Sequence, residues 1–145
     1  MNASFYRYRS FDDQHFRDIE ERVDAHMEGL CAFRDRDIST FHNRDEDAVS
    51  RVFADFETVL GPVGTAKCLH LLAPKFFPLW DRAIAYEYGI SLGSMGSNGP
   101  NYVRFMAMAQ EQCAAVTVAG YTGPNALKSI DEYNYCRFTK GWILP

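Results

Sequence analysis

Apolar residues recur three or four positions apart through most of this chain, and this spacing constrains its fold more than any other feature. The pattern is most regular over residues 46–60, where one face of a helix collects Val49, Val52, Phe53, Phe56, Val59 and Leu60. A strand would alternate apolar and polar residues instead, and only the short run VTVAGY is a candidate for that pattern. The sequence therefore predicts an all-α fold.

Turn-forming residues divide this pattern into five to six helices. The expected helices cover approximately 12–34, 46–60, 62–73, 82–90, 101–118 and 125–139. Residues 1–11 are expected to form an extended arm or short lead-in, and the Gly- and Ser-rich run 91–100 a flexible loop. Residues 34–47 are expected to form a polar connection in which the runs RDRD and NRDED are solvated. The whole chain, 1–145, is expected to form one compact helical bundle, because its length leaves no room for two cores.

The helical stripes also predict which residues form the core. One shared core is expected to contain Val52, Phe53, Phe56, Leu69 and Leu72. The stripe of the first helix consists of Phe16, Ile19, Val23, Met27, Leu30 and Cys31. The chain has four cysteines, most of them in such patterns, and no pair has C-x-x-C spacing. Reduced thiols buried in the core are therefore expected, rather than a disulfide framework or a metal site.

Composition argues against several classes of protein. The net charge is −4, which disfavours a domain that coats nucleic acid but leaves room for a local basic site. No apolar run approaches the ~20 residues that span a bilayer, and the N-terminus lacks the apolar stretch of a secretory signal. A cytoplasmic protein without a membrane partner is expected, and no pattern calls for a metal or another cofactor. The motifs of phosphate-binding loops, serine hydrolases and zinc enzymes do not occur.

The stretch 60–85, LGPVGTAKCLHLLAPKFFPLWDRAIA, carries the most chemistry. Two glycines near its start allow a ligand to approach the backbone closely, and the unpaired N–H groups that begin the next helix suit a phosphate. That helix places Lys67 and His70 on one face. A loop stiffened by two prolines then delivers Asp81 to the start of another helix. This carboxylate could act as a base or stabilise a developing cation, and the lysine could act as an amine nucleophile.

This stretch resembles the catalytic region of the helix-hairpin-helix DNA glycosylase superfamily. Leu60-Gly61-Pro62-Val63-Gly64 resembles the family's hairpin, and Phe77-Pro78-Leu79-Trp80-Asp81 resembles the loop that ends in its catalytic aspartate. Glycine and proline stand in the opposite order from the family's hairpin, and Lys67 lies one residue later than the lysine of the bifunctional enzymes. The resemblance covers residues 60–85 alone.

The resemblance implies a helix-hairpin-helix element in a DNA-repair hydrolase that cleaves the N-glycosidic bond of a modified base. Asp81 would be the catalytic carboxylate, and Lys67 would be the Schiff-base lysine of the bifunctional members. The residues that would contact DNA are Gly61, Val63, Gly64, Thr65, His70 and Trp80. The stretch also resembles uncharacterised bacterial proteins with a K-x-x-H-x-x-x-P-x-x-F-P-x-x-D pattern, which implies no activity. The matching residues are Lys67, His70, Pro74, Phe77 and Asp81.

Each of these residues also has a structural interpretation. The glycines could mark a helix boundary, Asp81 could cap a helix, and Lys67 could be a solvated lysine. His70 could be a histidine at the edge of the core, and Trp80 a core anchor rather than a residue that stacks on a flipped base.

Two other functions therefore stay open. One is a non-catalytic helical module that binds nucleic acid or a protein partner, and the other is an interaction protein that oligomerises through aromatic helices. The aromatic and basic C-terminal run YNYCRFTKGW could serve as such a surface or dock on the core. The sequence specifies neither a base, nor a partner, nor an oligomeric state.

Overall fold

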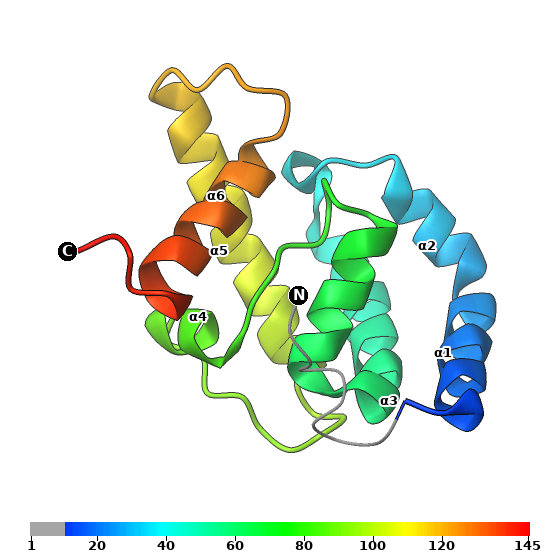
Figure 1. Cartoon of the computed structure of the whole chain (residues 1–145). Helices are drawn as coiled ribbons and strands as arrows, with labels where there is room; N and C mark the ends of the chain where they lie inside the picture. The colour runs from blue at the N-terminus through cyan, green and yellow to red at the C-terminus, as the bar shows by residue number, and fades with distance from the viewer. Residues whose placement is uncertain (1–10) are drawn as a thin grey trace.

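Six α-helices make up most of residues 11–145, the part of the chain that the structure describes (Figure 1). In this computed structural model they are α1 (Asp13–Ala25), α2 (Met27–Arg34), α3 (Glu46–Leu72), α4 (Arg82–Glu87), α5 (Gly99–Val118) and α6 (Ala126–Asn134). Two 3-10 turns, η2 (Ile38–Thr40) and η3 (Asn43–Asp45), precede α3, and a π-helical segment, η4 (Tyr135–Thr139), follows α6. The described residues contain no strand, which confirms the predicted all-α fold. The arm expected over 1–11 lies outside them except for its last residue.

α3 lies at the centre of the arrangement. It packs against α5, and α5 in turn packs against α6, while α1 and α2 lie against α3 on its other side (Figure 1). The short helix α4 packs against η4, near the C-terminus. These contacts join the helices into one bundle around a large apolar core.

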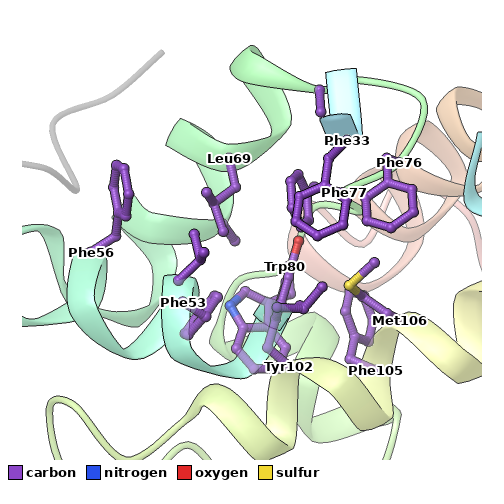
Figure 2. Close-up of a cluster of buried hydrophobic side chains, with 14 of the residues drawn as sticks. Phe33, Phe53, Phe56, Leu69, Phe76, Phe77, Trp80, Tyr102, Phe105 and Met106 are labelled. Carbon is purple, nitrogen blue, oxygen red and sulfur yellow. The ribbon is translucent and has the colours of Figure 1, made fainter. Parts of the chain in front are cut away.

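The predicted core is confirmed. Its buried members are Val52, Phe53, Phe56 and Leu69, and Leu72 packs half-buried against them. The centre of the core is aromatic: the rings of Phe53 and Tyr102 stack 4.4 Å apart, and Trp80 stands edge-on to both (Figure 2). Because such rings bury large areas, they hold α3, α5 and the loop before α4 together.

The helix expected over 12–34 is broken in two at His26. Its start is as predicted, because the Asp12 side chain accepts a hydrogen bond of 2.8 Å from the backbone N–H of His15. At His26 the backbone leaves helical geometry, and the imidazole lies 2.8 Å from Asp55 Oδ2 on α3. The break interrupts the phase of the apolar stripe, so the prediction is wrong for Met27 and Cys31, which follow it and are exposed. Phe16, near the start of α1, is exposed as well, and the prediction is also wrong there.

In the polar connection before α3, no residue of the runs RDRD and NRDED is buried, but the segment between these runs is anchored to the core. Ile38 and Phe41 are buried. Arg36 forms an ion pair of 2.7 Å with Asp45 and lies 4.7 Å from the centre of the Phe76 ring. The hydrogen bonds and charge of Arg36 lower the pKa of the Asp45 carboxyl group. The buried side chains of Ile38 and Phe41 thus anchor the connection to the protein interior.

The Gly- and Ser-rich run 91–100 has no helix until Gly99, but it is anchored at its end. The Asn98 backbone N–H donates to Glu57 on α3 at 3.1 Å, and the Asn98 side-chain amide donates to the same carboxylate. The Asn98 side-chain oxygen accepts a hydrogen bond of 2.7 Å from the N–H of Gly93. Because Glu57 is completely buried, this network secures the loop to the interior.

The four cysteines are free thiols that differ in exposure. Cys113 is buried, Cys68 and Cys136 are half-buried, and Cys31 is exposed. The expectation of buried core thiols is therefore confirmed for Cys113 and wrong for Cys31, while Cys68 packs half-buried against the core. Helical spacing alone does not say which side of a helix meets the core.

Within residues 11–145, no helix combines the length and the apolar character needed to cross a membrane.

Candidate functional site

α3 turns sharply at Gly61. The φ of 69° and ψ of 172° at this residue are not helical, and Pro62 begins the second half of α3. A positive φ is unfavourable for a residue with a Cβ atom, and proline suits the first turn of a helix because its missing N–H is not needed there. The predicted end of one helix and start of the next are confirmed at these two residues. Figure 1 shows the two halves of α3 as separate neighbouring segments.

The turn is buried. Every residue from Gly61 to Ala66 is buried, and the indole N–H of Trp80 donates a hydrogen bond of 3.1 Å to the Pro62 carbonyl. The implied phosphate-binding residues Gly61, Val63, Gly64 and Thr65 thus lie inside the protein. A DNA phosphate could contact these backbone groups only if the turn became exposed.

Asp81 is held in one position by two hydrogen bonds. Its Oδ1 accepts from the backbone N–H of Ile84 at 2.9 Å, so the residue caps α4, as its structural interpretation predicted. Its Oδ2 accepts from the hydroxyl of Thr139 at 2.6 Å. The residue is partly exposed. The carboxylate is therefore both accessible and oriented, which a catalytic group requires.

The contact with Thr139 brings this carboxylate to the aromatic and basic C-terminal run. In this run the Arg137 guanidinium lies 5.7 Å from the centre of the Tyr133 ring, and the Lys140 ammonium lies 5.8 Å from that of Trp142. Tyr133 and Trp142 are exposed, the latter by 69%. Cations beside exposed aromatic rings are the combination with which proteins contact the phosphates and bases of nucleic acids.

Three polar side chains hold the loop that leads to Asp81. The contacts are His70 Nδ1 to the Phe77 carbonyl (2.8 Å), the Tyr102 hydroxyl to the Pro78 carbonyl (2.7 Å) and the Leu79 N–H to Asp131 Oδ1 (3.0 Å). They come from α3, α5 and α6 in turn. Because the backbones of three consecutive residues are hydrogen-bonded, these tertiary contacts position the loop. Its two prolines only limit the backbone conformations that it can adopt.

Asp131 is the site residue that the sequence analysis missed. It is buried, and burial raises the pKa of its carboxyl group to about 7, although the hydrogen bond from Leu79 opposes that shift. Its Oδ2 lies 3.8 Å from His70 Nδ1 and has no hydrogen-bond partner within the described part of the chain. The signal in the sequence was its spacing of four from Leu127, which places a carboxylate on the apolar face of α6.

Lys67 and Trp80 lie in different environments. Lys67 is half-buried on the second half of α3, three residues before His70. Trp80 is only 1% exposed and lies within the aromatic core (Figure 2). In this structure Trp80 is thus a core anchor, and stacking on a base would require it to leave the core.

A hollow of about 890 Å³ lies between η2, α5 and the loop that follows α5. Its lining is mixed and includes Ile38, Gln110, Glu111, Cys113 and Tyr121. None of the residues singled out in the stretch 60–85 lines it. The hollow is therefore distinct from the site around Asp81.

Comparison with known proteins does not extend the resemblance. No family model matches the chain, and no curated protein or solved structure matches it either. The likeness to helix-hairpin-helix glycosylases thus rests on the stretch 60–85, and the functional argument rests on the geometry around Asp81.

Proposed function

We propose that this chain is a divergent DNA glycosylase-like protein that binds DNA and cleaves the N-glycosidic bond of a modified base. The observation that supports this best is the placement of Asp81, whose partly exposed carboxylate is fixed by two hydrogen bonds beside the C-terminal run. Cleavage of an N-glycosidic bond develops positive charge on the sugar. A carboxylate already fixed in position stabilises such charge in the transition state more than in the ground state.

The charges near Asp81 support a nucleic-acid partner. Arg82 follows it directly and is exposed, and Arg137 and Lys140 belong to the run that Thr139 joins to it. Such cations neutralise phosphates and release counterions, so binding that depends on them weakens as the salt concentration rises. A local group of this kind is compatible with a chain whose net charge is −4.

A cleavage screen tests the proposal. The full chain is incubated with DNA duplexes that each carry one damaged or modified base, and the strands are then analysed with and without alkali. Strand breaks that appear only with alkali would identify a monofunctional glycosylase, and breaks without alkali would add lyase chemistry. Folded protein that leaves every duplex intact under both conditions would refute the glycosylase proposal.

Asp81→Asn separates catalysis from capping. Asparagine caps a helix about as well as aspartate, so the hydrogen bond from Ile84 is kept, while the negative charge is lost. We expect an unchanged melting temperature and DNA affinity, but a loss in cleavage rate of roughly 10- to 1,000-fold. Glu87→Gln, at the other end of α4, is the matched control for charge and should cleave normally. A variant Asp81→Asn that cleaves at the wild-type rate would assign the residue to capping alone.

Lys67 is expected not to form a Schiff base. Its position is shifted by one residue from that of the bifunctional enzymes, which turns it by about 100° around the helix. Borohydride treatment in the presence of abasic DNA should therefore trap no covalent complex. An adduct that disappears in Lys67→Ala but persists in Lys75→Ala would show that this expectation is wrong.

A non-catalytic binding module is the second candidate function. It is favoured by the burial of the turn at Gly61 and by the structural use of both oxygens of Asp81. Such a protein would bind DNA or a protein partner through the C-terminal run. It would bind DNA with a strong salt dependence yet leave every duplex of the screen intact, and Asp81→Asn would bind as the wild type does.

A further inference from the structure

We propose that Asp131 is a positioning residue that controls, through Leu79, where Asp81 lies, and that it does so according to its protonation state. The consequence for catalysis rests on the proposed function of Asp81, but the positioning itself does not. Asp131 is 5% exposed, and its Oδ1 accepts a hydrogen bond from Leu79, two residues before Asp81.

The path from Asp131 to Asp81 is short and bonded throughout. Leu79 is followed by Trp80, whose indole N–H is bonded to the Pro62 carbonyl at the turn of α3. Asp81 comes next and caps α4. Only Trp80 separates Leu79 from Asp81, and its side chain is itself hydrogen-bonded. A shift of the Leu79 backbone would therefore act on both the turn at Gly61 and the cap of α4.

Of the three side chains that hold the loop, Asp131 is the one whose bond changes near neutral pH. Burial keeps the pKa of the Tyr102 hydroxyl far above neutral pH, so it remains a donor. The His70 Nδ1–H can donate to the Phe77 carbonyl whether or not the other ring nitrogen is protonated. An ionised Asp131, by contrast, accepts from Leu79 more strongly than the protonated acid does.

The surroundings of Asp131 contain few charges. From α3 it faces His70, whose Nδ1 is 3.8 Å from its free Oδ2. Tyr102 and Cys113 from α5 and Tyr88, which follows α4, lie close enough for the carboxylate to raise their pKa values. Glu132 is the neighbour of Asp131 on α6. Burial raises the pKa of Asp131 to about 7, so both of its protonation states occur near neutrality. Ionisation strengthens the hydrogen bond that Asp131 accepts from Leu79.

Nuclear magnetic resonance of the full, ¹⁵N-labelled chain tests this without any enzyme assay. We expect the Leu79 amide, the Trp80 indole and the Ile84 amide to shift together with one midpoint near pH 7, because the Ile84 N–H is bonded to Asp81. Asp131→Asn keeps an oxygen acceptor for Leu79 and should abolish all three transitions. Glu132→Gln changes the exposed carboxyl group next in sequence and should keep all three transitions, with a somewhat lower midpoint because the Glu132 charge helps to raise the pKa of Asp131.

One further variant, His70→Asn, decides whether such a transition originates from Asp131 or from His70. His70→Asn should keep the transition, because the hydrogen bond from Leu79 to Asp131 does not involve His70. A transition that vanishes in His70→Asn and persists in Asp131→Asn would belong to His70 and overturn the inference. A shift of Leu79 without one of Ile84 would also overturn it, because the effect would not reach Asp81.

Thermal unfolding provides an independent reading. An unfolded aspartate has a pKa of about 4, so from about pH 4 to 7 the folded chain retains a proton that the unfolded chain has released. The wild type should therefore lose melting temperature relative to Asp131→Asn as the pH rises through this range, and the difference should be constant above it. A difference that does not vary with pH would contradict a buried, titrating Asp131.

The cleavage assay separates this inference from the proposed function. If the chain is a glycosylase, the wild-type rate should rise as Asp131 ionises, and Asp131→Asn should show a rate without this step. If no duplex is cleaved while the three resonances titrate as expected, the proposed function fails and the positioning role stands. If cleavage occurs without those transitions, the positioning role fails alone.

Discussion

Replacing Trp80 by alanine is expected to lower the free energy of unfolding by about 3–5 kcal/mol. The side chain is 1% exposed and contacts the rings of Phe53, Tyr102 and Phe105. Its removal leaves a large cavity at the centre of the core and deletes the indole hydrogen bond to the Pro62 carbonyl in a buried turn. Both effects act in the same direction, so this variant should be among the least stable single substitutions in the protein.

Trp142→Ala is the matched control, because the chain has two tryptophans and Trp142 is 69% exposed. It should change the free energy of unfolding by no more than about 0.5 kcal/mol. Urea unfolding followed by circular dichroism measures both variants. If Trp80→Ala were as stable as Trp142→Ala, Trp80 would not be a core anchor, and its interpretation as a base-stacking residue would regain support.

Gly99→Ala is expected to cost about 1–3 kcal/mol of stability through overpacking. Gly99 begins α5 where that helix meets α3, and an added Cβ atom would lie 2.5 Å from the Ser50 carbonyl oxygen. A backbone oxygen cannot rotate away as the end of a side chain can. Either α5 must move away from α3 or the contact remains strained, and both outcomes weaken the packing that supports Tyr102.

Gly29→Ala provides the opposite case. Gly29 lies within α2, and nothing lies within 4 Å of a Cβ atom added there. Alanine favours a helix over glycine by up to about 1 kcal/mol, so this variant should be slightly stabilised. Chemical denaturation of the two variants side by side checks the prediction. Equal stabilities would show that the close approach of α5 to α3 is not present in solution.

The sequence predicted the helices best where local rules are sufficient. The stripe over 46–60 forms a single regular helical segment because its spacing agrees with the helical repeat along its whole length. The turn at Gly61 was equally predictable, since the combination of glycine and proline fits few other conformations. The first helix differed from the prediction at a point where a residue distant in sequence makes a contact. The break at His26 lies beside Asp55, which is 29 residues away.

The candidate site was predictable only in part. Asp81 was identified from its place after a proline loop and at a helix start, and the structure keeps it there. The burial of the turn at Gly61 was not predictable, because exposure depends on what packs over a segment rather than on its own residues. Asp131 was missed because its significance arises from a loop 52 residues earlier in the chain.

By itself, the sequence determined the all-α class, the turn at Gly61 and the aromatic core, because each follows from side-chain spacing or from the backbone limits of single residues. Only the tertiary structure decided that Asp81 meets Thr139 across 58 positions and that Asp131 holds Leu79. Hydrogen bonds of this kind need two groups brought within about 3 Å, and helix periodicity contains no information about such distances. The chemistry of this protein therefore depends on how its helices pack against one another.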